Sequence, residues 1–148
     1  MKFPSVVLAI AFVLFPTNAS SAEVNVQYDT NLDDPSLEVS RLACSDGKNG
    51  LITRYGFKNV GQIPAFPHIG GASVVSGWNS EQCGTCWKLT YTDANFKSKS
   101  IIILAVDRSA DGFNIAKEAM DQLTGGHAAE LGSIKVDATE VAVSECGL

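Results

Sequence analysis

The chain has 148 residues, of which 45% are hydrophobic and 18% charged, and these values fit one compact domain and argue against disorder. Its 11 Lys and Arg residues stand against 16 Asp and Glu residues, so the formal net charge is −5. An acidic surface disfavours electrostatic capture of nucleic acid or of anionic lipid. We therefore expect neither nucleic acid nor a membrane among the partners.

The first 22 residues predict a secretory signal peptide. Lys2 supplies a positive charge, an apolar run extends from Val6 to Phe15, and small residues follow it. Ser20 and Ala22 suit the −3 and −1 positions of a signal-peptidase site, so we expect cleavage before Glu23. A short N-terminal anchor helix is the alternative, although the apolar run is shorter than the roughly 18–20 residues that a spanning helix needs.

The predicted mature domain, residues 23–148, contains all four cysteines: Cys44, Cys83, Cys86 and Cys146. In an oxidising compartment an even number of cysteines predicts disulfides, here two with three possible pairings. The CxxC spacing of Cys83 and Cys86 is also that of redox enzymes, which place such a pair at a helix N-terminus. Here the pair instead precedes the alternating residues 87–91, which predict a strand. We therefore favour structural disulfides over a redox pair or a metal site.

Apolar periodicity predicts a small closed β-barrel with one helix. We expect strands over 24–28, 87–91, 101–106 (buried on both faces) and 134–138 continuing through Val143, and a shorter strand that starts at Leu37 and Val39. The segment 45–84 is rich in turn residues but has enough apolar anchors to be ordered. The helix is expected over 114–123, with Asn114 or Asp111 as its N-cap and Gly125 at its end.

Several strings along the domain resemble motifs of the cerato-platanin family, which consists of small, secreted, cysteine-bridged fungal proteins. They are CSDGKNGL (44–51), PAFPHIGG (64–71), NSEQCGTCW (79–87), LAVD (104–107), GFNIA (112–116) and CGL (146–148). Together they span nearly all of residues 23–148, in the family's order and with its four-cysteine spacing.

This resemblance implies a six-stranded double-ψ β-barrel with short helices and the disulfides Cys44–Cys83 and Cys86–Cys146. It also implies a secreted, extracellular protein of the fungal cell wall that needs no cofactor. Family members bind chitin (N-acetylglucosamine) oligosaccharides, loosen cell-wall polysaccharide as expansins do, and elicit plant defence. A plant surface receptor is therefore a possible partner. Self-assembly, which some relatives show, has little support because the sequence reveals no contiguous exposed apolar patch.

The resemblance also indicates where sugar would bind. Asp107 ends the apolar run 101–106, and in related barrels an Asp at the similar position faces the glycan groove; the alternative is that it accepts backbone N–H bonds there. Carboxylates, amides and aromatic rings commonly hold sugars, so the predicted carbohydrate-binding residues are Tyr28, Asp46, Asn49, Asp107 and Asn114. Tyr55 is an alternative aromatic contact. Trp87 is assigned to the core, whereas Trp78 lies in a loop and is undecided.

A weak glycoside hydrolase with Asp107 as general acid is the alternative function. Hydrolysis normally needs a second carboxylate, for which Asp29 and Asp46 are the candidates, neither within a recognisable catalytic motif. His68 and His127 have no neighbouring nucleophile that would suggest a triad. We therefore expect a non-catalytic binder.

One departure from the family pattern follows Asp107, where this chain has Arg108 and Asp111. Because both residues carry charge, we expect them to alter the charge beside the groove and to affect the choice of oligosaccharide.

Overall fold

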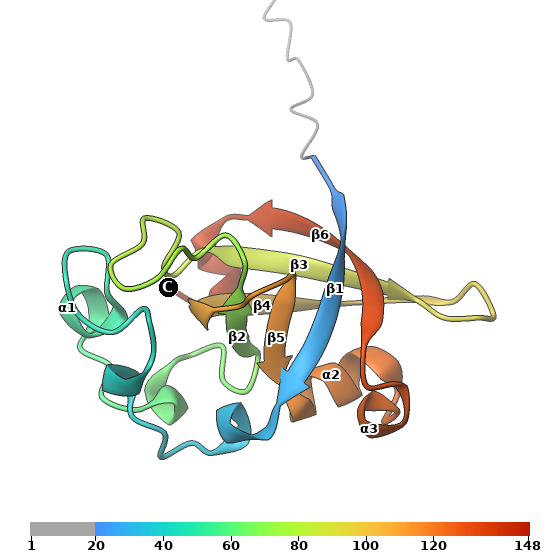
Figure 1. Ribbon diagram of the computed structural model, residues 1–148, viewed down its shortest axis with the longest axis horizontal. Coiled ribbons are helices and arrows are strands. Elements are labelled where there is room, and N and C mark those ends of the chain that lie inside the picture. The colour runs from blue at the N-terminus through green and yellow to red at the C-terminus, as the bar shows by residue number, and fades with distance from the viewer. Residues whose placement is uncertain (1–19) are drawn as a thin grey trace, which may run out of the picture.

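The computed structural model describes residues 20–148, in which six strands close into one barrel (Figure 1). The strands are β1 (Ala22–Asp29), β2 (Ile69–Ala72), β3 (Cys86–Thr92), β4 (Ser98–Arg108), β5 (Phe113–Ala116) and β6 (Ile134–Val141). Their order around the barrel is β1-β5-β2-β4-β3-β6. The predicted signal peptide falls mainly on residues outside the described part, so the peptide and its cleavage before Glu23 stay predictions.

Short helices surround the barrel. They are α1 (Leu51–Tyr55), α2 (Lys117–Thr124) and α3 (Ala128–Leu131), with single 3₁₀ turns η1 (Thr30–Asp33), η2 (Val39–Arg41), η3 (Val60–Gln62) and η4 (Val143–Cys146). Across residues 20–148, none of the helices has the length and apolarity of a membrane-crossing segment.

The barrel interior is filled by alternate side chains of its strands. Two strand pairs are parallel, β1 with β5 and β2 with β4, and the other neighbours are antiparallel. Val26, Leu89, Ile103 and Ile115 are all fully buried, and Leu104, on the opposite face of β4 from Ile103, is fully buried as well. The closed barrel that apolar periodicity predicted is confirmed, and so are the six strands and short helices that the family resemblance implied. The apolar alternation along β1, β3 and β6 points into one shared core.

The prediction of a strand at Leu37 and Val39 is wrong. Val39 begins η2 instead, and in the described residues the ladder contact nearby is a single bridge from Glu38 to Asn59. Val39 is fully buried, and its N–H donates to the carbonyl of Lys58 across the loop. Alternation here reflects a loop whose apolar side chains anchor it to the core.

Two four-residue strands, β2 and β5, were not predicted from the sequence. β2 reads IGGA, and its two glycines carry no side chain that could produce an alternating pattern. The glycines are required by close packing: a Cβ at Gly71 would lie 2.7 Å from the carbonyl oxygen of Arg108 on β4. β2 therefore forms because it pairs with the backbones of β4 and β5, and its own side chains give no sign of it.

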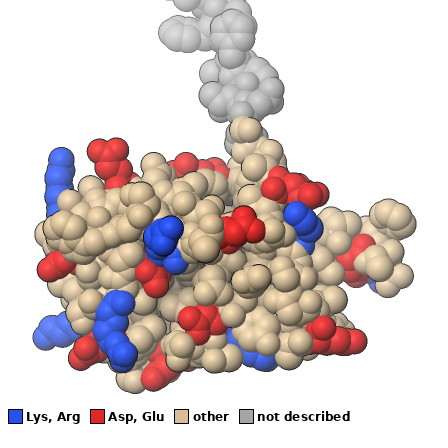
Figure 2. Space-filling model, viewed as in Figure 1, with Lys and Arg blue, Asp and Glu red and all other residues tan. Residues whose placement is uncertain are grey.

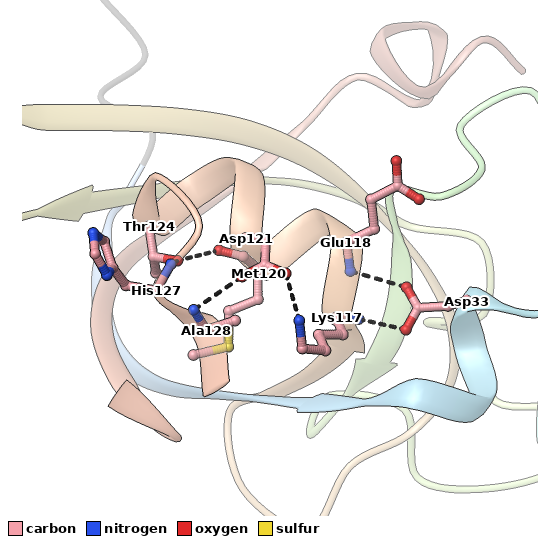
Figure 3. A network of polar contacts seen from close by, with 8 residues as sticks. All are labelled: Asp33, Lys117, Glu118, Met120, Asp121, Thr124, His127 and Ala128. Carbon is pink, nitrogen blue, oxygen red and sulfur yellow. Dashed lines mark hydrogen bonds and ion pairs between the residues drawn. The ribbon is translucent and has the colours of Figure 1, made fainter. Parts of the chain in front are cut away.

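The expected helix 114–123 begins later than predicted, at Lys117. Asn114, together with Ile115, belongs to β5, because the parallel ladder with β1 holds these residues extended. Neither Asn114 nor Asp111 caps the helix. The cap comes from Asp33, whose carboxylate accepts N–H bonds from Lys117 (3.1 Å) and Glu118 (2.9 Å) (Figure 3).

The other end of α2 is as predicted, with Gly125 in the left-handed conformation at φ 67°. A polar network then fixes the corner between α2 and α3 (Figure 3). Asp121 accepts bonds from the Lys117 ammonium at 2.7 Å and from the Ala128 N–H at 3.0 Å. The hydrogen bond with Lys117 is the main cause that lowers the pKa of Asp121, and it raises the pKa of Lys117.

Two disulfides join Cys44 to Cys83 and Cys86 to Cys146, as the family resemblance implied. They close segments of 39 and 60 residues, and no cysteine of residues 20–148 is free. Cys83 and Cys86 thus bond to different partners, so the CxxC string ties the long loop and the C-terminus to the start of β3. The redox interpretation of this string is excluded.

Candidate functional site

An open groove of about 400 Å³ lies where the end of β1 meets the ends of other strands and the loop around η2. The parallel register aligns β1 with β5, and β5 in turn places Asn114 opposite Gly71 on β2. A bulge at Gly70 and Gly71 brings Gly71 level with Asp107 on β4. The groove is lined by Asp29, Thr30, Asn31, Leu32, Asp34, Leu37, Arg41, Leu42, Gly71, Asp107, Arg108 and Asn114.

Asp107 lines this groove and also holds its wall. Its Oδ1 atom accepts hydrogen bonds from the N–H groups of Ala43 (2.9 Å) and Arg108 (2.8 Å). The sequence left two alternatives for Asp107, and the structure shows both. The side chain faces the groove, and it also accepts backbone N–H bonds. Its Oδ2 atom makes no hydrogen bond within residues 20–148 and is free to accept one from a ligand.

Charges of both signs line the groove. Asp29, Asp34 and Asp107 face it together with Arg41 and Arg108. Within the described part of the chain, neither arginine lies within 4.0 Å of a carboxylate oxygen. Hydrogen bonds from the Ser36 hydroxyl and N–H lower the pKa of Asp34. The lining thus offers hydrogen-bond donors and acceptors side by side.

The predicted carbohydrate-binding residues are only partly brought together. Asp107 and Asn114 share the groove, whereas Asp46 and Asn49 lie outside it. The Asp46 carboxylate instead accepts the indole N–H of Trp78, and Asn49 bonds to Asn79.

The aromatic candidates also lie away from the groove lining. Tyr28 is half-buried against the barrel core. Tyr55 stacks on Phe57 with ring centroids 5.5 Å apart. Trp87 is half-buried and packs edge-on against Phe113, in agreement with its assignment to the core. Trp78 is 64% exposed and therefore does not belong to the core.

Of the two candidates for a second carboxylate, Asp29 lies in the groove with Asp107 and Asp46 does not. His68 and His127 are each hydrogen-bonded to a single side chain, Gln122 and Glu130 respectively. Residues 20–148 contain no group of three or more His, Cys, Asp or Glu side chains placed to hold a metal ion.

The charged residues that depart from the family pattern separate in the structure. Arg108 lines the groove as expected. Asp111 is absent from the lining and accepts a hydrogen bond from the side-chain amide of Asn25 at 2.6 Å. Asp111 thus joins β1 to the loop before β5.

Four polar or charged groove residues were not predicted: Thr30, Asn31, Asp34 and Arg41. Asn31 carried a weak sequence signal, since it follows directly on the polar end of the first strand. Arg41 carried none, because only the fold of the η2 loop brings it to the groove.

Comparison with known proteins agrees with this barrel. The sequence model of the Cerato-platanin family matches residues 24–148. The chain is 50% identical over 151 residues to the heat-stable 19 kDa antigen of Coccidioides posadasii, covering 100% of this chain and 99% of that protein. It is 42% identical to allergen Asp f 15 of Aspergillus fumigatus, covering 83% of this chain and 76% of the allergen.

Solved structures are similar as well. Cerato-platanin 1 from M. perniciosa is 46% identical with a TM-score of 0.79, covering 83% of this chain and 98% of that one. The solution structure of the fungal elicitor Cerato-Platanin is 36% identical with a TM-score of 0.70, covering 83% and 96%. With the barrel, the disulfide pairing and these matches together, the chain belongs to the cerato-platanin family.

Proposed function

We propose that this protein is a secreted, non-catalytic binder of chitin oligosaccharides and cell-wall polysaccharide. It acts at the fungal cell wall, where it loosens polysaccharide networks as expansins do, and it elicits defence in plant tissue. No cofactor takes part.

The observation that carries this proposal is the groove that contains Asp107 and Asn114. A neutral sugar presents hydroxyl and amide groups that both donate and accept hydrogen bonds. The Asp107 Oδ2 atom and the Asn114 amide lie beside two arginines that have no ion-pair partner within residues 20–148. A groove with mixed donors and acceptors suits an uncharged polar ligand better than a strongly charged one.

Secretion is supported by the two disulfides, which persist in oxidising compartments. Elicitation is supported by a relative described as a fungal elicitor, and other relatives are named an antigen and an allergen. A plant surface receptor is the partner that elicitation would require.

The test is a titration of the ¹⁵N-labelled protein with chitin oligomers, followed by backbone amide shifts. We expect saturable shifts that cluster around Asp107 and Asn114, with dissociation constants in roughly the millimolar to micromolar range. Asp107→Asn should weaken binding, whereas Asp137→Asn on β6, outside the groove, is the matched control and should not. Saturable shifts elsewhere without any in the groove would reject the groove, and no shifts at all would reject the function.

A weak glycoside hydrolase is the second candidate, because Asp29 and Asp107 line the same groove. In this mechanism Asp107 protonates the leaving oxygen and Asp29 acts as base or nucleophile. It predicts soluble reducing ends from chitin or glucan that disappear in Asp107→Asn. Binding without such products in a sensitive assay would leave the non-catalytic function.

A further inference from the structure

Trp78 is an exposed side chain with a fixed orientation. It lies in the loop between β2 and β3 and is 64% exposed. Its indole N–H nevertheless donates a hydrogen bond of 2.6 Å to the Asp46 Oδ1 atom. An unrestrained surface tryptophan would rotate freely, so this contact restricts the ring to one orientation.

The loop that carries Trp78 is joined tightly to the loop that carries Asp46. The Asn49 N–H donates to the side-chain oxygen of Asn79 at 2.9 Å, and the Asn49 side-chain amide donates to the Asn79 carbonyl at 3.0 Å. Asn79 itself has a left-handed backbone, with φ 58°. The Cys44–Cys83 disulfide links the same two loops covalently.

Gly47 leaves the space into which the ring packs. A Cβ at this position would lie 3.1 Å from the Cζ2 atom of Trp78 and 2.7 Å from the side-chain oxygen of Asn79. Its φ of 79° also favours glycine. Trp78, Asp46, Gly47 and Asn79 are called the Trp78 platform below.

The exposure of the Trp78 ring and the side chains around it indicate what kind of ligand it fits. Exposing an indole ring forgoes the favourable burial of a large apolar surface. The exposed positions Lys48, Ser76 and Glu81 nearby are polar, and Val74, at 42%, is the one other large apolar side chain of the β2–β3 loop that is exposed, so these two side chains form no broad apolar patch of the kind that docks proteins. A single rigid aromatic face among polar groups fits the apolar face of a sugar ring.

We infer that the Trp78 platform is a sugar-binding subsite that stacks one pyranose ring of a chitin oligosaccharide, outside the groove. The Asp46 Oδ2 atom has no partner within residues 20–148 and lies beside the ring to accept a sugar hydroxyl. Asp46 and Asn49, predicted to bind sugar, here position the aromatic residue that does. This inference rests on the proposed function for its class of ligand.

The segment from Leu42 to Asp46 connects the groove to the platform, because Leu42 lines the groove and Asp46 belongs to the platform. The N–H of Ala43 binds Asp107 in the groove, and Asp46, three residues further on, binds Trp78. A longer oligosaccharide is therefore expected to use both sites, and its affinity should exceed that of a short one.

The test uses the two indole N–H resonances of the ¹⁵N-labelled protein, which Trp87→Phe assigns to Trp78 and Trp87. Titration with chitin oligomers should shift the Trp78 indole resonance to saturation and leave that of Trp87 in place. Trp78→Ala should weaken binding about three- to tenfold. Phe96→Ala, which removes another exposed aromatic ring far along the β3–β4 hairpin, is the matched control and should bind as the wild type does.

The outcomes separate the inference from the proposed function. If groove amides shift while the Trp78 indole does not, and Trp78→Ala binds normally, the platform is refuted and the function stands. If neither region shifts at any oligomer length, both fail. The wild-type indole titration decides the matter even if Trp78→Ala does not fold.

Discussion

The carboxylate of Asp107 on β4 accepts a hydrogen bond from the main-chain N–H of Ala43, 64 residues earlier in the chain. This contact fixes one wall of the groove to the barrel, since the neighbouring Cys44 N–H donates to the carbonyl of Val106 on the same strand. A side chain that faces the groove thus also holds the loop that shapes it.

The two roles of Asp107 should be separable by substitution. Asp107→Asn retains an oxygen that accepts the Ala43 and Arg108 N–H bonds, so it should melt close to the wild type. Asp107→Ala leaves these N–H groups without an acceptor and should lose about 1–3 kcal/mol of unfolding free energy. Thermal and urea unfolding measure this difference. Equal destabilisation by both variants would show that the loop contact needs the negative charge.

Loss of the Asp33 carboxylate should destabilise α2, although Asp33 lies 84 residues before Lys117. Asp33→Ala removes the acceptor for two helix N–H groups, and we expect a loss of about 1 kcal/mol and a melting temperature lower by several degrees. Asp34→Ala is the control, because within residues 20–148 the side chain of Asp34 bonds only to the nearby Ser36. If Asp34→Ala were as unstable as Asp33→Ala, the loss of stability would come from damage to the η1 turn and not from loss of the helix cap.

Phe96→Gly should stabilise the protein. Phe96 is 90% exposed at the tip of the β3–β4 hairpin, seen projecting from the barrel in Figure 1, and has φ 60°. A left-handed backbone is unfavourable for a bulky side chain by about 1–2 kcal/mol, and glycine removes most of this strain. Phe96→Ala keeps a Cβ and should change the melting temperature little. A lower melting temperature for the glycine variant would show that the backbone at Phe96 is not strained.

The contact between Lys117 and Asp121 should make stability depend on pH in the acid range. Because it lowers the pKa of Asp121 in the folded state, its contribution is present above the ordinary pKa of about 4 and is lost as the pH falls through the lower folded value. Asp121→Asn keeps an acceptor for Ala128 but abolishes this titration. The gap in melting temperature between wild type and variant should therefore be small at pH 7, since the pair is partly exposed, and vanish near pH 2.

Each disulfide should contribute about 2–4 kcal/mol by restricting the unfolded chain. The double variants Cys44→Ala/Cys83→Ala and Cys86→Ala/Cys146→Ala remove one bridge each without leaving a free thiol. Chemical denaturation should show a loss in both, slightly larger for the bridge that closes 60 residues than for the one that closes 39. Peptide mapping of the wild type should find no bond between Cys83 and Cys86.

Charges of both signs are also mixed on the surface outside the groove. On the face drawn in Figure 2, acidic and basic side chains are interspersed, with no large area of one sign. The acidic excess of the sequence is thus dispersed on this face.

Local patterns in the sequence predicted the parts of the fold that have their own periodicity. β1, β3, β4 and β6 each contain alternating or continuous apolar residues, and Gly125 marks the end of α2 by a conformation that glycine favours. Disulfides were predictable in number from composition, whereas their pairing came from the family motifs. Such signals are local, so a single chain reveals them without its neighbours.

The remaining features were decided by contacts between segments far apart in the chain. β2 and β5 form because neighbouring backbones hold them extended, and α2 starts at Lys117 because Asp33 reaches it from another loop. Asp46 could be identified as a polar loop residue from the sequence, but only the tertiary structure places its carboxylate against the indole of Trp78. Residue type and local spacing thus determined the barrel and which residues could bind sugar, and long-range hydrogen bonding and packing decided which of them face the groove.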